Sequence, residues 1–144
     1  MKVIFVGSNP SWAATTSRAF DESTYSGKVL VGWTKTLEGP NVYRFANVCD
    51  KPTPNNRPLK TSEIKDNIAQ LKVWLDSYGE GKIVALGKTA ARALTLLQLP
   101  FYEMPHPSGM NRLLNDSEYV AQKLKGLREF IETPLCTQQD QGCD

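Results

Sequence analysis

Hydrophobic and polar positions follow two different patterns along this chain. Four short apolar runs, each closed by glycine, proline or a polar residue, are typical of β-strands, and we expect strands at residues 2–7, 42–48, 82–86 and 101–104. Longer segments between them repeat apolar residues every three or four positions, which is the spacing of one face of an α-helix. The pattern therefore predicts strands that alternate with helices.

The first two helices have recognisable ends. We expect the first to be capped by Ser26 and to stop at Gly39-Pro40, and the second to begin at Thr61 and stop at Gly79. Their apolar stripes are Val29, Leu30, Trp33 and Leu37 in the first helix, and Ile64, Ile68, Leu71 and Leu75 in the second. Each stripe predicts a helix with one buried face.

The remaining two helices are expected at residues 88–97 and 117–132, the latter capped by Asn115 or Asp116. The last helix should bury Val120, Leu124, Leu127 and Ile131. Strands that alternate with helices of this length form βαβ units, so the expected fold class is α/β, a three-layer α/β/α sandwich with a short, mainly parallel four-stranded sheet. Binding sites in such sheets lie beyond the carboxyl ends of the strands.

Length and composition restrict the partners. The 144 residues fit one ordinary domain, expected at residues 1–133, with a polar, disordered tail at 134–144. No run reaches the ~18 apolar residues of a membrane span, so we expect no membrane partner and a cytoplasmic location. A net charge of +2 predicts that any contact with nucleic acid is local. The three cysteines indicate neither a disulfide framework nor a four-thiolate metal site.

One apparent motif is misleading. Gly87-Lys88-Thr89 resembles the end of a phosphate-binding P-loop, but Gly81 lies one residue too far upstream for that motif. The residues between them are better used as the third strand. We therefore expect Gly87 to form a tight turn from that strand into the next helix.

Two loops carry candidate chemistry. Gly7-Ser8-Asn9-Pro10-Ser11 follows the first strand and holds Asn9 where its amide can orient a water, or where it ties down its own loop. His106-Pro107-Ser108-Gly109-Met110-Asn111-Arg112 follows the last strand and contains the only histidine of the chain. Prolines on both sides of His106 stiffen its backbone, which suits a catalytic group, although a lone histidine can also be structural.

Together these two loops resemble the uracil-DNA glycosylase superfamily, over residues 1 to about 131. The similarity is closest to two types. The mismatch-specific type shares the Asn-Pro turn and the Pro-Ser-Gly-x-x-Arg run, and the single-strand-selective monofunctional type shares the Asn-Pro turn and the His-Pro-Ser run. Residues 42–48 look like the third-motif strand of that superfamily and residues 82–90 like its Leu-Gly-Lys turn. The resemblance implies a metal-independent glycosylase that flips a base out of DNA, uses no cofactor and takes part in base-excision repair.

The resemblance also implies roles for particular residues. Asn9 would position the attacking water, and His106 would donate a hydrogen bond to O2 of the departing base. Asn47 would pair with the N3 and O4 edge of uracil, unless it is a buried asparagine satisfied by backbone. Phe20 would stack on the base, a role that Tyr25 or Trp12 could also fill. The remaining expected substrate contacts are Gly7, Ser8, Pro10 and Ser11.

DNA contacts are expected from the second loop. Met110 would fill the gap left by the flipped nucleotide, or else pack on the last helix, and Arg112 would hold a phosphate or the opposite strand. Ser108 and Gly109 complete this expected DNA-binding group. Further phosphate contacts could come from Arg44, Arg57 and Lys60.

Three departures from the family pattern bear on activity. Ser11 stands where the most uracil-specific branch has an aromatic residue that excludes thymine, so 5-substituted pyrimidines could enter. Asn9 replaces an aspartate of that branch. The chain also lacks the four cysteines of the iron–sulfur members, so no cluster is expected.

Two alternative functions stay open. One is an N-glycosidase acting on free nucleotides or modified bases, and the other is a catalytically silent binding module of the same fold.

Overall fold

The computed structural model describes residues 2–9, 25–37, 39–49, 51, 53, 58–107 and 112–133, with only the backbone at 25, 26, 112 and 113. None of the described helices is long and apolar enough to span a bilayer. The expected tail at 134–144 lies outside the described residues. In chain order the elements are β1 (Lys2–Gly7), α1 (Tyr25–Thr34), β2 (Val42–Asn47), α2 (Thr61–Tyr78), β3 (Lys82–Leu86), α3 (Lys88–Leu96), β4 (Tyr102–Met104), the 3₁₀ turn η2 (Arg112–Asn115) and α4 (Ser117–Glu132).

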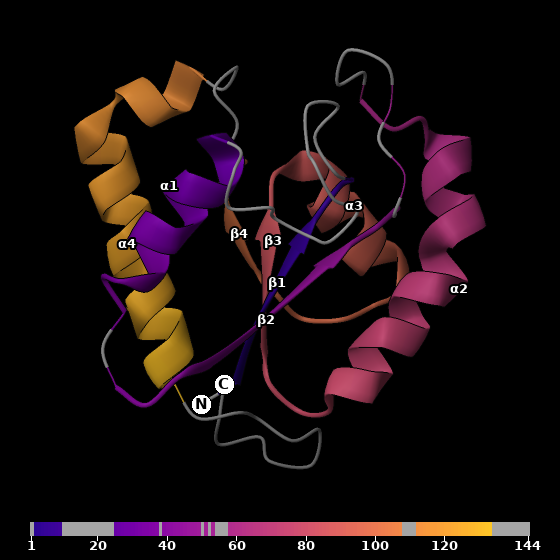
Figure 1. Cartoon of the computed structure of the whole chain (residues 1–144), viewed down its shortest axis with the longest axis horizontal. Coiled ribbons are helices and arrows are strands. Elements are labelled where there is room, and N and C mark those ends of the chain that lie inside the picture. The colour runs from indigo at the N-terminus through magenta and orange to yellow at the C-terminus, as the bar shows by residue number, and fades with distance from the viewer. Residues whose placement is uncertain are drawn as a thin grey trace.

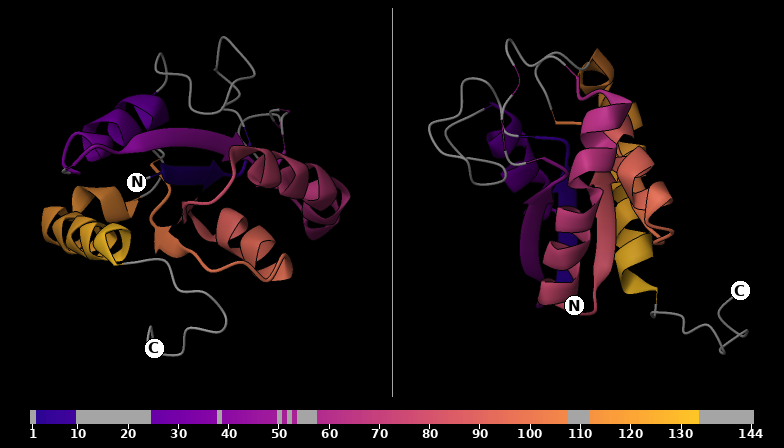
Figure 2. Two further views of the ribbon diagram at one scale, coloured as in Figure 1. Left: turned by 90° about the horizontal axis from the view of Figure 1, so that it is seen from below. Right: turned by 90° about the vertical axis from the view of Figure 1, so that its right-hand side faces the viewer.

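The strands form one parallel sheet between two layers of helices. Their order is β2-β1-β3-β4, and each neighbouring pair is parallel. Helices α1 and α4 cover one face, whereas α2 and α3 cover the other (Figures 1 and 2). The structure therefore confirms the α/β class and the three-layer sandwich.

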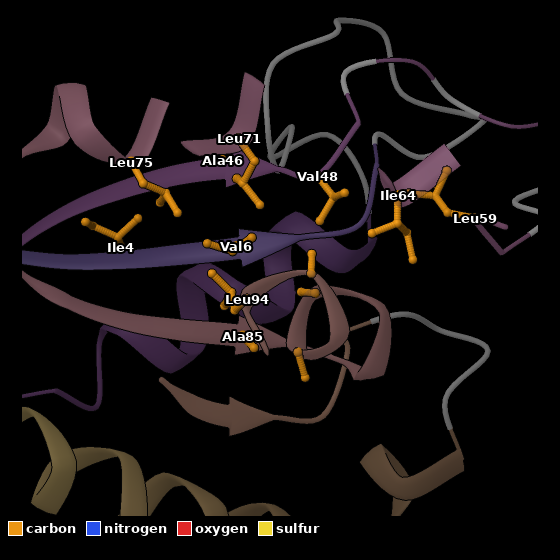
Figure 3. Packing of buried hydrophobic residues seen from close by; sticks show 13 residues of the cluster. Ile4, Val6, Ala46, Val48, Leu59, Ile64, Leu71, Leu75, Ala85 and Leu94 are labelled. Carbon is orange, nitrogen blue, oxygen red and sulfur yellow. The ribbon is translucent and has the colours of Figure 1, made fainter. Parts of the chain in front are cut away.

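The hydrophobic core is divided by the sheet. Successive side chains of a strand point to opposite faces, so Val3 and Phe5 join the cluster beneath α1 and α4, and Ile4 and Val6 join the one beneath α2 and α3. Figure 3 shows the second cluster, in which Ile4 and Val6 meet residues from α2 and α3. Because helices cover both faces, the central strand β1 has apolar residues at consecutive positions.

Most element bounds agree with the expectation. Both ends of β1, β3 and α4 are confirmed, and α2 begins at Thr61 as expected. Strand β2 ends at Asn47, β4 begins at Tyr102 and α3 ends at Leu96, each one residue inside the expected bound, a difference usual at element ends. Asp116 is the N-cap of α4, because its side chain accepts a hydrogen bond from the third backbone N–H of that helix at 3.0 Å.

The first helix differs from the expectation at both ends. It begins at Tyr25, so Ser26 is its second residue and not its N-cap. It ends at Thr34, well before the Gly-Pro pair. The hydroxyls of Thr34 and Thr36 each donate at 2.7 Å to the backbone carbonyl three residues earlier. The backbone N–H groups of Thr36 and Leu37 also donate three residues back, at 3.0 and 3.1 Å, so the chain tightens into a 3₁₀-type turn and the helix stops.

A matched pair of glycines tests the packing of α4 against β4. An alanine Cβ at Gly126 in α4 would overlap the hydroxyl of Tyr102, which donates to the carbonyl of Lys123 at 3.0 Å. Gly126→Ala should therefore lower the free energy of unfolding by about 1–3 kcal/mol in urea titrations. At Gly32 in α1 a Cβ meets nothing within 4 Å. Gly32→Ala should raise stability by about 0.5–1 kcal/mol, and equal effects at both positions would contradict this packing.

Candidate active site

Five of the expected site residues lie at one edge of the sheet, namely Gly7, Ser8, Asn9, Asn47 and His106. Asn47 is the last residue of β2 and pairs with Gly7, the last residue of β1. Asn9 and His106 each follow the last residue of a strand, β1 and β4 respectively, by two positions. The parallel strands bring these ends to the same, carboxyl edge. Since β3 separates β1 from β4, the backbones of those two strands are about 10 Å apart, two interstrand spacings.

Backbone hydrogen bonds continue beyond the strand ends and hold this edge together. The two N–H groups that follow β2 donate to the carbonyls of Gly7 and Ser8, both at 2.9 Å. Between β3 and β4, the N–H of Gly87, the residue after β3, donates to the carbonyl of Met104 at 2.8 Å. The segments that carry Asn9 and His106 therefore start from fixed backbone positions.

The Asn9 side chain is held by three contacts. Its Nδ2 donates to the backbone carbonyl of Lys51 at 3.1 Å and to the hydroxyl of Thr53 at 3.4 Å. Its Oδ1 accepts a hydrogen bond from the Ser8 hydroxyl at 3.2 Å. Because a backbone carbonyl can only accept, the NH₂ group of Asn9 must face Lys51, and this fixes the orientation of the amide.

The donors and lone pairs of the Asn9 amide that are still unused decide which further hydrogen bonds it can make. A primary amide has two N–H donors and two lone pairs on its oxygen. Lys51 and Thr53 engage the donors and Ser8 engages one lone pair, so one lone pair on Oδ1 is left. Asn9 thus ties down the segment after β2 as well as its own loop, and it can still accept a hydrogen bond from a water.

Asn47 is half-buried and stands beside a glycine. Alternation along β2 places it on the same face of the sheet as Phe45, beneath α1 and α4. Its partner Gly7 contributes no side chain to that pair. Among the described residues, the Asn47 amide has no hydrogen-bond partner.

His106 lies against the turn that follows β3. Pro105 and Pro107 on either side of it are buried, and the histidine itself is half-buried. Gly87 has a φ of 93°, and an ideal Cβ there would lie 3.0 Å from the Cβ of His106. Burial lowers the pKa of His106 below its ordinary value of 6.5, which favours the neutral imidazole.

Most of the other expected site residues lie outside the part of the chain that the structure describes. Pro10, Ser11, Phe20, Ser108, Gly109 and Met110 lie outside the described residues, as do Trp12 and Arg57. Of Tyr25 and Arg112 only the backbone is described, in α1 and η2. Arg44 and Lys60 are exposed. Among the described residues, no three His, Cys, Asp or Glu side chains gather closely enough to hold a metal ion.

The sequence did not indicate the residues that hold Asn9 and His106. Thr53 and the carbonyl of Lys51 belong to an irregular polar stretch without periodicity, and nothing there marks a contact with a residue more than 40 positions away. Gly87 was correctly expected at a tight turn, and its positive φ confirms that expectation. Its contact with His106 depends on the pairing of β3 with β4, which the sequence pattern does not specify.

A comparison with known families adds independent information. A family model described as the Uracil DNA glycosylase superfamily matches residues 1–128. This range includes all four strands and the positions of Asn9, Asn47 and His106. No curated protein matches the chain.

The turn at Gly87 provides a test of how His106 is held. Gly87→Ala adds a Cβ at a left-handed backbone position and within 3.0 Å of the histidine. We expect it to lower the free energy of unfolding by about 1–3 kcal/mol and to move the imidazole signals in a ¹H–¹³C spectrum. Unchanged imidazole signals would show that Gly87 does not hold the ring.

The lowered pKa of His106 predicts a measurable titration. Because it is the only histidine, its imidazole gives a single NMR titration curve, whose midpoint should fall below 6.5. In the unfolded chain the group protonates at its ordinary pKa, so as pH falls below 6.5 the unfolded state binds the proton first and stability decreases. His106→Gln should lose this part of the pH dependence. A midpoint at or above 6.5 would contradict the burial argument.

Proposed function

The chain belongs to the uracil-DNA glycosylase superfamily, and we propose that it is a monofunctional glycosylase that removes uracil or a related modified pyrimidine from DNA. Members of this superfamily are in general DNA N-glycosylases, which hydrolyse the bond between base and deoxyribose. The observation that carries the proposal is the Asn9 amide, fixed by Lys51 and Thr53 with one lone pair of Oδ1 left to accept from water.

The substrate base must first leave the duplex. Enzymes that act on a base inside double-stranded DNA rotate the nucleotide out of the stack into a pocket. The carboxyl edge of the sheet supplies polar groups for such a pocket, with Asn47 on one side of Gly7 and His106 beyond β4. The Asn47 amide offers both a donor and an acceptor, which match the N3–H and O4 groups of uracil.

The attacking water is positioned by Asn9. Its Oδ1 accepts a hydrogen bond from the water, which turns a water lone pair toward C1′ of the deoxyribose. An amide is a very weak base, so the contribution of Asn9 is orientation and not proton abstraction. A new C1′–O bond forms, the bond between C1′ and the base nitrogen breaks, and the base leaves with the electron pair.

The departing base is stabilised by His106. The negative charge that develops on the pyrimidine ring reaches its O2 atom, where a neutral imidazole can donate a hydrogen bond. Burial favours that neutral form through the lowered pKa of His106. A donor fixed in advance is effective because it needs no reorganisation as the charge develops. The proton lost by the water ends on the released base or in solvent.

The product is an abasic site in an intact strand. Position 9 is occupied by an amide and not by a lysine, so no Schiff base forms there and strand cleavage is not expected. The same proposal includes a pocket wall at Ser11 open to 5-substituted pyrimidines, stacking by Phe20 and a substrate contact from Pro10. Ser108, Gly109, Met110 and Arg112 are proposed to contact DNA, with the methionine filling the gap left by the base.

An oligonucleotide assay tests this function. Wild-type protein should convert a uracil-containing strand to an abasic strand, detected by alkaline cleavage. His106→Ala should lower the single-turnover rate by roughly 100-fold or more, as for other donors that stabilise a developing anion. Asn9→Ala should also lower it strongly, because the water loses its fixed acceptor.

A matched asparagine serves as the control. Asn41 directly precedes β2 and so lies at the opposite, amino edge of the sheet, where its amide contacts the Tyr43 hydroxyl at 3.4 Å. Asn41→Ala should leave the rate unchanged. Equal rates for wild type and the Asn9→Ala, His106→Ala double variant would overturn the assignment, and binding of DNA without turnover would favour a silent binding module.

A further inference from the structure

We propose that Thr53, together with the Lys51 carbonyl, is a positioning group that holds the Asn9 amide in its reactive orientation and makes position 9 selective for asparagine over aspartate. This inference rests on the proposed function of Asn9. It concerns residues that lie in the segment after β2, whereas Asn9 follows β1.

The contacts run between the segment that follows β1 and the segment that follows β2. Thr53 is 5% exposed although it lies in a polar stretch, and its hydroxyl is 3.4 Å from Asn9 Nδ2. The Lys51 carbonyl accepts from the same nitrogen at 3.1 Å. The backbone bond from Cys49 N–H to the Ser8 carbonyl, at 2.9 Å, fixes the distance between the two loops just before these contacts.

Loss of the Thr53 hydroxyl would release one side of the amide. With both acceptors in place, each N–H of Asn9 has its own partner, and rotation of the amide by 180° would set Oδ1 against the Lys51 carbonyl. Valine has almost the shape of threonine but offers no acceptor. In Thr53→Val one N–H therefore loses its partner, which weakens the preference for the orientation that leaves Oδ1 available to water.

The same contacts disfavour a carboxylate at position 9. Ionised aspartate has only acceptor oxygens. One of them would face the Lys51 carbonyl at the 3.1 Å separation that the Asn9 nitrogen now occupies, so two acceptors would repel each other. Protonated aspartic acid avoids this, because its O–H donates to Lys51 and its C=O takes the place of Oδ1. Position 9 thus accepts asparagine, or aspartate only in its neutral form.

Single-turnover excision from a uracil-containing oligonucleotide tests the threonine. Thr53→Val should lower the rate about fivefold to tenfold, the usual effect of losing one hydrogen bond, whereas Thr53→Ser should stay within about twofold of wild type. Affinity for the oligonucleotide should not change in either variant. Thr34→Val removes another half-buried hydroxyl, at the end of α1, and should leave the rate unchanged.

The pH profile of Asn9→Asp tests the selectivity. Its rate, divided by the wild-type rate at each pH, should rise as pH falls, because only the protonated acid reproduces the amide. The ratio removes contributions of titratable groups common to both proteins, such as His106 and the Cys49 thiol, whose sulfur is 3.7 Å from the Lys51 carbonyl. A ratio that rises with pH would indicate a carboxylate acting as a base and would overturn the selectivity.

A spectroscopic measurement separates this inference from the proposed function. The side-chain NH₂ signals of Asn9, assigned by their loss in Asn9→Ala, should exchange slowly with solvent in wild type and Thr53→Ser, and faster in Thr53→Val. This holds even if wild type excises no base, in which case only the proposed function fails. Identical exchange and identical rates in both threonine variants would overturn the inference, and Asn9→Asp decides it if Thr53→Val does not fold.

Discussion

The parallel pairing of β1 with its two neighbours is the constraint on which the rest of the structure depends. Because β2, β1, β3 and β4 run in the same direction, all their carboxyl ends reach one edge. Helices on both faces leave that edge as the place where loops can carry polar groups. Asn9, Asn47 and His106 come from three different strand ends, and the shared direction of the strands brings them to a common edge.

Asn9 and His106, two polar side chains at this edge, have different surroundings. Asn9 is fixed by hydrogen bonds from and to its amide, which leave a single acceptor position unused. Burial lowers the pKa of His106, which lies against Gly87, and so favours the neutral imidazole. In the proposed function, Asn9 orients a neutral water and His106 meets a developing negative charge. This division requires no strong base and agrees with the asparagine at position 9.

Local pattern was sufficient to predict most elements but not their contacts. The apolar run of β1 and the apolar stripe of α2 identify those elements, because the spacing of apolar residues follows directly from which faces are buried. The predicted end of α1 was wrong because the backbone after Thr34 switches to hydrogen bonds three residues back, an effect that hydrophobic spacing does not register. Thr53 was missed since its contact with Asn9, 44 positions away, follows from the pairing of β1 with β2. Site residues in the two loops were found from motifs, and their roles stay predictions.

The most direct test of this account is a crystal structure of the Asn9→Ala variant bound to an oligonucleotide that contains uracil. The account predicts a uracil rotated out of the DNA, with its N3 and O4 edge within hydrogen-bond distance of the Asn47 amide and its O2 facing His106. Space for a water should remain on the side of the missing Asn9 amide. A uracil that stays stacked in the DNA, or that binds away from the carboxyl edge of the sheet, would contradict the account.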